Sequence, residues 1–291
     1  MSIAAVTEKD FRDAIRSRLL LVLTALFVLF AIALSWFVSE FDQQVQFQEE
    51  IAGEVTTLVL IEGFVGPVSI FIPIVAIAAS YRAIAGERQS GSLKLLLSLP
   101  NDRPDVVVGK FFGRAGVVSV AVLTGFTVGL VATAALGLSI SILEYLTFVF
   151  VSLLLAFVFV SISVGVSAFT ASTSRAAYGA FGVFVVFQFL WDILVTGFVY
   201  AANGFSFPGP EEELADWVEN GAELLLVIDP TTAYEQGVLW VIRRVAEDLD
   251  VEGAAADVPF YAQDWFGFVF LLIWIAVPLA VGYARFESSD L

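Results

Sequence analysis

Few residue types in this 291-residue chain can carry covalent or metal chemistry. The chain contains no cysteine and no histidine, and its one methionine is Met1. Thiol and histidine-based nucleophilic catalysis are therefore excluded, and soft-metal ligation is nearly excluded. The remaining candidate is Asp192, the one acid that interrupts a long apolar run. A carboxylate at membrane depth indicates a transport pathway or gate, and the alternative is a hydrated position at the outer end of a span.

A second candidate site is the segment 87–100, ERQSGSLKLLLSLP, which combines charges with five leucines in seven positions. Gly91 and Pro100 delimit a predicted short helix there, and Ser92 can cap its start. The leucines occupy both faces of this helix, with Leu93, Leu96 and Leu97 on one and Leu95 and Leu99 on the other. A helix that is apolar all round must be covered from two directions. The membrane domain can cover one side, so we expect a cytoplasmic partner protein on the other; a re-entrant segment is the alternative.

The elements that must position these residues are membrane helices. The chain is 59% hydrophobic, and its mean hydropathy is +0.89. A bilayer core of about 30 Å needs about 20 apolar residues of helix. Six runs qualify, the fifth continuing past Asp192: residues 19–38, 63–81, 115–143, 145–174, 176–191 and 265–284. The sequence therefore predicts an all-α membrane protein with six transmembrane helices, and a very apolar soluble bundle is the alternative.

Basic residues predict the orientation of these spans. Of the 14 lysines and arginines, 12 lie in the segments 1–18, 82–114, 171–175 and 285–291. The positive-inside rule then places the N- and C-termini in the cytoplasm. Most acids fall on the other side, where they can attract cationic substrates or form a salt-adapted surface. Three lysines against eleven arginines favour the second interpretation, a halophile such as a haloarchaeon.

Residues 1–18 predict an amphipathic helix that lies in the membrane interface, and a basic leader that only fixes topology is the alternative. Thr7 can cap its first turn, with Asp10 at the capping-box position. Arg114, near the inner end of the third span, is expected to snorkel to the lipid phosphates. In the second span Pro67 and Pro73 favour a kink. In the third, two glycines four residues apart favour close packing, Gly125 and Gly129.

The acidic outer segment 202–264 separates the last two spans. Helices are predicted at 211–228 and 233–249, with a break between them at Asp229 and Pro230. The apolar stretch 238–242 either dips into the bilayer edge or covers a cavity mouth. With no long soluble segment and no internal repeat, residues 1–291 are expected to form a single transmembrane domain.

The segment 82–110 resembles a stretch found in membrane subunits of ABC-2 type transporters, E-R-x-x-G-[ST]-L-x-L-L-L-[SA]-x-P, followed by a basic residue and G-K. The matching residues are Glu87, Arg88, Gly91, Ser92, Leu93, Leu95, Leu96, Leu97, Ser98, Pro100, Arg103, Gly109 and Lys110. A second likeness is to the family's N-P-x-x-A-Y motif, with Asp in place of Asn, at Asp229, Pro230, Ala233 and Tyr234. The resemblance covers essentially the whole chain and implies an ABC-2, type V exporter-like permease fold.

The resemblance also implies partners. Such permeases are homodimers or pseudo-dimers in the cell membrane, mostly exporters, with two separate ABC ATPase subunits on the cytoplasmic side. The segment 82–110 would be the coupling helix that sits in a groove of the ATPase, with ion pairs from Glu87, Arg88 and Arg103 to that partner. The candidates for a pathway or gate are Asp192, Asp229, Pro230 and Tyr234.

ATP and Mg would be bound by the partner, because this chain has no GxxxxGK[ST] loop; Gly109 and Lys110 lack the upstream glycine and the following Ser or Thr. No cofactor, metal or nucleic acid is expected on the chain itself. One subgroup of the family assists maturation of nitrous-oxide reductase, but a chain without histidine and cysteine offers no direct copper ligands. A membrane-embedded enzyme and a structural or assembly protein without transport are the alternatives to a permease.

Overall fold

The computed structural model describes residues 3–45, 52–93, 103–209, 214–248, 263 and 265–288. Within these ranges the chain is almost wholly helical and has no strand. Six helical stretches are long and apolar enough to cross a membrane: Arg18–Glu40, Val55–Ser90, Pro104–Ala135, Ile142–Ala168, Thr173–Ala202 and Phe266–Glu287. The predicted all-α membrane fold with six spans is confirmed.

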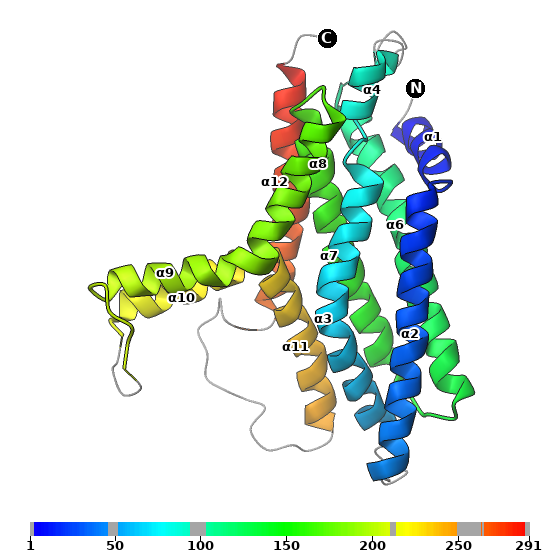
Figure 1. Cartoon of the computed structure of the whole chain (residues 1–291), viewed down its shortest axis with the longest axis vertical. Helices are drawn as coiled ribbons and strands as arrows, with labels where there is room; N and C mark the ends of the chain where they lie inside the picture. The colour runs from blue at the N-terminus through cyan, green and yellow to red at the C-terminus, as the bar shows by residue number, and fades with distance from the viewer. Residues whose placement is uncertain are drawn as a thin grey trace.

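The elements in chain order are α1 (Ile3–Ala14), α2 (Arg18–Val45), α3 (Ala52–Ser80), α4 (Ala85–Ser90), α6 (Arg103–Ala135), α7 (Ile142–Ala168), α8 (Thr173–Val185), the π-helix η1 (Val186–Leu190), α9 (Trp191–Ala202), α10 (Asp216–Ile228), α11 (Pro230–Asp248) and α12 (Phe266–Glu287). The long helices run side by side, and both termini lie at the same end of the bundle as α4 (Figure 1). We call this the terminus end. Its cytoplasmic location stays a prediction.

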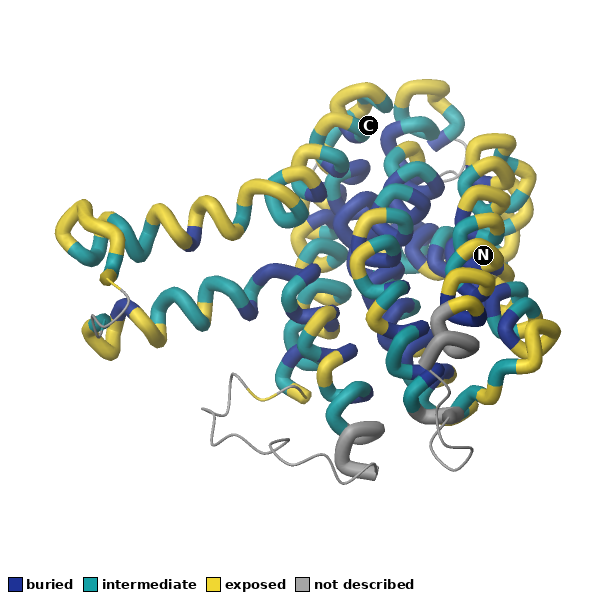
Figure 2. Tube along the Cα trace, turned by 60° about the horizontal axis from the view of Figure 1, so that its bottom comes forward, coloured by how far each residue is buried: buried dark blue, intermediate teal, exposed yellow. Residues whose placement is uncertain are grey.

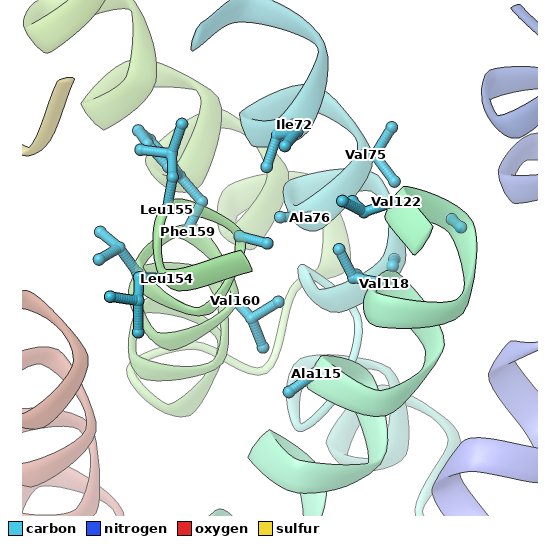
Figure 3. Packing of buried hydrophobic residues seen from close by; sticks show 14 of the residues in the cluster. Ile72, Val75, Ala76, Ala115, Val118, Val122, Leu154, Leu155, Phe159 and Val160 are labelled. Carbon is cyan, nitrogen blue, oxygen red and sulfur yellow. The ribbon is translucent and has the colours of Figure 1, made fainter. Parts of the chain in front are cut away.

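The central helix of the bundle is α7. In its most apolar stretch 78% of the residues are buried, against 22% or less in the first, fifth and sixth spans. A tube coloured by burial shows the buried residues gathered in the middle of the bundle (Figure 2). Side chains of α3, α6 and α7 meet there, among them Ile72, Val118 and Phe159 (Figure 3). Since the outer spans expose apolar side chains, those faces are suited to contact with lipid.

Glycines let the helices approach closely. A Cβ on Gly125 would collide with the ring of Phe27, and one on Gly129 would lie 3.2 Å from the Cβ of Ala31. These contacts confirm the predicted close packing and show that α2 is the partner. Between α7 and α12, the hydroxyl of Ser161 donates to the carbonyl of Ile275 at 2.7 Å.

The predicted limits of the third span were wrong. The helix begins at Arg103 and ends at Ala135, whereas the apolar run predicted 115–143. The sequence suggested a later start because four charged residues lie in the stretch from Arg103 to Arg114. In the structure two of them, Lys110 and Arg114, have partners inside the protein. In the second span, Pro67 and Pro73 lie within one continuous helix.

The fifth span changes direction at η1. After this π-helical turn, α9 leaves the bundle and lies beside α10, and the two project sideways (Figure 1). The indole N–H of Trp191 donates to the carbonyl of Leu225 at 2.8 Å and joins the two helices. We call α9 and α10 the lateral arm. Next to it, α11 packs on the bundle through Val238 and Val241, which are buried. Of the apolar stretch 238–242, Val238 and Val241 therefore face the protein core, whereas Leu239 is exposed.

Candidate coupling site

The short helix α4 begins immediately after the turn that ends α3, and α7 caps it. The first backbone N–H groups of a helix have no partner within the helix. Here the hydroxyl of Ser167 accepts from the N–H of Ile84 at 3.1 Å and from that of Ala85 at 2.9 Å. The start of α4 is thereby attached to the most buried helix of the bundle.

Two further side chains attach α4 to other spans. The hydroxyl of Thr173, the first residue of α8, donates to the side-chain carbonyl of Gln89 at 2.9 Å. The guanidinium of Arg88 lies 5.0 Å from the ring centre of Phe286 on α12, a cation–π distance. Six residues thus contact three spans. A displacement of α4 would therefore disturb its contacts with α7, α8 and α12 together.

A fourth attachment of α4 is ionic and runs to α1 and α6. Oε1 of Glu87 lies 2.9 Å from Nζ of Lys110 and 3.6 Å from Nζ of Lys9. The sequence predicted a role for Glu87 in ion pairs to an ATPase, but the structure pairs this oxygen with lysines of its own chain. Its other oxygen, Oε2, is buried and has no hydrogen-bond partner among the described residues.

Lys110 belongs to a cluster of four charges in which Asp10 and Lys110 are buried and Glu87 and Arg114 are half-buried. Lys110 Nζ lies 3.2 Å from Oδ1 of Asp10. The guanidinium of Arg114 donates to both carboxylate oxygens of Asp10, at 2.6 and 3.0 Å, and to the carbonyl of Ala79 at 2.6 Å. Arg114 thus binds one of the unpaired carbonyls at the end of α3.

These contacts correct two predictions about the first and third helices. Asp10 is not part of a capping box, because α1 already begins at Ile3 and the Asp10 carboxylate binds cations of α6. Arg114 does not extend toward the lipid phosphates, because its guanidinium is used inside the protein. Thr7 likewise donates its hydroxyl to the carbonyl of Gly109, at 3.2 Å, instead of capping a helix start.

Glycines of α6 bring α1 close enough for these contacts. A Cβ on Gly109 would lie 2.7 Å from the Cβ of Val6, and one on Gly113 would lie 2.9 Å from the Cβ of Asp10. The buried face of α1 is therefore packed on α6. Its basic residues remain exposed, at Lys9, Arg12 and Arg16, so the predicted contact of that face with the membrane interface stays a prediction.

The predicted coupling segment, 82–110, contains α4, and its leucine stretch 93–99 comes shortly after that helix. Gly91 ends α4 with φ of 76°, a left-handed conformation that glycine adopts without strain. The hydroxyl of Ser92 lies 2.9 Å from that of Ser90, at the surface. Leu93 is only 1% exposed and packs into the chain's own core. At this residue, the face predicted for Leu93, Leu96 and Leu97 is covered by the membrane domain and not by a partner. Leu95, Leu96, Leu97 and Pro100 lie outside the described residues, as does the side chain of Arg103.

The candidates for a pathway or gate lie away from this site. Asp229 caps α11: its carboxylate accepts from the N–H of Thr231 at 3.1 Å and from that of Thr232 at 3.2 Å. Pro230 then occupies the first position of the helix. Burial raises the pKa of Asp229 to about 6, while the hydrogen bonds from the two threonines oppose the rise. Tyr234 is fully buried, with its hydroxyl 3.5 Å from that of Ser152 on α7.

Asp192 is exposed in the first turn of α9, next to the π-helix. With Thr196 and Phe207 it lines a recess of about 540 Å³ in the lateral arm. Its charge and that of Asp229 both raise the pKa of Glu235, after the larger effect of burial. The structure therefore brings these acids into electrostatic range of one another. In the described part of the chain, no group of three or more metal-ligating side chains could hold an ion.

Sequence reasoning missed the structural roles of Asp10 and Ser167, and it did not single out Glu235. The sequence did contain a signal for the role of Asp10. Lys110 and Arg114 are four residues apart, so they share one face of an apolar helix and require a buried acid. For Ser167, nothing in the local sequence distinguishes it from the other serines of α7.

Comparisons with known proteins agree with the all-α membrane fold with six candidate spans. The family model described as ABC-2 family transporter protein matches residues 4–291. The chain is 29% identical to the probable ABC transporter permease protein NosY of Stutzerimonas stutzeri, over 97% of this chain and 96% of that protein. It is 28% identical to the protein of the same name in Pseudomonas aeruginosa, over 98% of each chain.

Proposed function

Because the chain belongs to the ABC-2 family of transporter proteins and is the multi-pass membrane permease subunit of an ABC transporter, we propose that it couples ATP hydrolysis by a separate ATPase subunit to export of a substrate. The ATPase docks on the segment that follows α4. ATP and Mg bind to that partner, and this subunit is not itself an enzyme.

The observation that carries this proposal is the set of contacts made by α4. A helix of six residues is attached to α7 through Ser167, to α8 through Gln89 and to α12 through Arg88. It directly precedes the segment whose leucines require a partner. A displacement of that segment by the ATPase can therefore be transmitted to three spans through hydrogen bonds and packed side chains. ATP-driven coupling requires such a transmission.

A co-purification experiment tests this function. The permease is expressed with an ABC ATPase encoded beside its gene, and the bound ATPase is quantified after purification of the permease. Leu96→Glu places a charge among the leucines and should reduce bound ATPase at least tenfold. The matched control is Leu136→Glu in the turn after α6, where the leucine is exposed, and it should leave binding unchanged. Equal binding by both variants would contradict the docking site.

Gly91→Pro tests transmission separately from docking. Proline holds φ near −65°, so it cannot adopt the φ of 76° found at Gly91. The variant should bind ATPase but lose permease-dependent stimulation of ATP hydrolysis. Normal stimulation would show that the geometry at the end of α4 is not used for coupling.

A second copy of the permease is part of the same proposal. The lateral arm projects from the bundle (Figure 1) and exposes large apolar side chains, among them Ile193, Leu194 and Trp217. Native mass spectrometry of the complex should show two permeases with two ATPases, and one permease per complex would contradict this. The acidic composition, with more arginines than lysines, supports a halophilic host, in which case the purified complex should keep its activity in molar salt.

A further inference from the structure

The charge cluster at the terminus end joins three helices through one lysine. Nζ of Lys110 on α6 contacts Asp10 of α1 at 3.2 Å and Glu87 of α4 at 2.9 Å. Lys110 is 2% exposed and Asp10 is 5% exposed. Since α1 and α4 are far apart in sequence, Lys110 is a physical link between the N-terminal helix and the helix that precedes the leucine stretch 93–99.

The two halves of this link are not equivalent. Asp10 is also held by two hydrogen bonds from Arg114, which in turn binds the carbonyl of Ala79. The glycines Gly109 and Gly113 add close packing of α1 on α6. The α1–α6 contact therefore has several independent supports. Glu87 is more exposed, at 20%, and its ionic contacts are to Lys110 and, at 3.6 Å, to Lys9.

The two halves of the link therefore differ in strength: α1 is held firmly on α6, and α4 is held less firmly. α1, the start of α6 and the end of α3 form a rigid unit, because Asp10, Arg114 and Ala79 connect all three. α4 follows the end of α3 after the turn 81–84, and the Glu87 carboxylate is its ionic contact with α1 and α6. Buried ion networks give little net stability over apolar packing, and their best-attested use is to fix one arrangement. The cluster is thus suited to fixing the position of α4.

We propose that Lys110 and Glu87 are positioning residues that fasten α4 to the α1–α6 unit, so that α1 moves as one body with the coupling segment when the ATPase closes. This inference rests on the proposed function. It gives α1 a role in coupling, and it identifies the Lys110–Glu87 contact as the fastening that one substitution can release without separating α1 from α6.

The variant that releases the fastening is Glu87→Gln. It removes the charge on α4, while Lys110 keeps Asp10 as its counter-ion. The matched control is Glu8→Gln, since Glu8 is exposed on α1 and its ion pair is with Arg12 of the same helix. The chain has no cysteine, so spin labels can be placed at the exposed positions Asp13 and Ser90 by Asp13→Cys and Ser90→Cys without further changes.

The experiment measures the label-to-label distance by double electron–electron resonance in the complex with the ATPase, without nucleotide and with ATP trapped by vanadate. The labelled parent and Glu8→Gln should give one narrow distribution that nucleotide does not move. Glu87→Gln should widen the distribution at least twofold and make its mean depend on nucleotide. It should also lower permease-dependent stimulation of ATP hydrolysis at least fivefold, with the same amount of ATPase bound.

Two results would overturn the inference. One is a distance in the labelled parent that changes with nucleotide, which would show that α1 and α4 move separately. The other is a narrow distribution and full stimulation in Glu87→Gln. Failure of the proposed function would look different: no ATPase would bind even to the labelled parent. In that case the widths measured for the permease alone still decide whether Glu87 fastens α4.

Discussion

The hydroxyl of Ser167 accepts a hydrogen bond from the backbone N–H of Ala85 at 2.9 Å. The same hydroxyl accepts from the N–H of Ile84 at 3.1 Å, so one side chain of the central helix satisfies two donors at the start of α4. These two hydrogen bonds attach the start of α4, within the coupling segment 82–110, to the core of the bundle.

Ser167→Ala should remove that tie. Two buried N–H groups would lose their acceptor, and an unsatisfied buried donor costs about 1–3 kcal/mol. The free energy of unfolding, followed by tryptophan fluorescence in detergent, should fall by an amount in that range. Ser163→Ala is the control, because Ser163 is also buried in α7 but its hydroxyl has no hydrogen-bond partner within the described ranges. Equal losses in the two variants would contradict the assigned role of Ser167.

Asp10→Asn should destabilise the protein strongly. Removing one member of a buried ion pair leaves charges without compensation and costs about 3–5 kcal/mol. Here Lys110 and Arg114 would both lose the Asp10 charge. Asp13→Asn on the exposed face of the same helix should change stability by no more than about 0.5 kcal/mol. A loss below about 1 kcal/mol for Asp10→Asn would show that the cluster is not held as described.

Gly113→Ala should weaken the packing of α1 on α6. The added Cβ would lie 2.9 Å from the Cβ of Asp10 and 3.1 Å from the carbonyl oxygen of Thr7. Overpacking of this kind costs about 1–3 kcal/mol. Gly182→Ala meets nothing within 4 Å, so the gain in helix propensity should make it neutral or more stable by up to about 1 kcal/mol. Thermal unfolding of the two variants compares these effects, and the same sign of change in both would contradict the close approach.

Stability should depend on pH through Asp229. Its folded-state pKa of about 6 lies above the ordinary value of 3.8, so the folded protein binds a proton more tightly than the unfolded chain. The tighter proton binding contributes to the free energy of unfolding. This contribution is fully present below pH 3.8 and is lost as the pH rises through about 6. The shift of about two units corresponds to about 3 kcal/mol.

Asp229→Asn should remove this pH dependence, because the amide does not titrate and its oxygen can still accept a hydrogen bond. Unfolding is followed between pH 4.5 and 7. The free energy of unfolding of the variant should rise relative to that of the parent protein as the pH rises. Asp216→Asn, in the exposed first turn of α10, serves as the control. A constant difference between the Asp229 variant and the parent across this range would count against the burial of a charged Asp229.

The broad fold could be predicted because a membrane span must be long and apolar, and that requirement is visible in composition alone. The start of α6 could not be placed, since Lys110 and Arg114 read as loop charges until Asp10 is known to lie against them. The bend after Leu190 was also missed, because the apolar run continues into α9 while the π-helix η1 turns the chain away. The coupling role of the segment 82–110 stays a prediction, and the burial of Leu93 could not be foreseen because it depends on packing between distant helices.

Site-specific photo-crosslinking from the coupling segment tests the central claim most directly. A photoreactive amino acid is placed at Leu96 and, as a control, at Leu224 of the lateral arm, and the permease is irradiated in membranes that contain the ATPase. The account predicts a covalent permease–ATPase product from position 96 and none from position 224. A bound ATPase that crosslinks to position 224 and not to position 96 would contradict it.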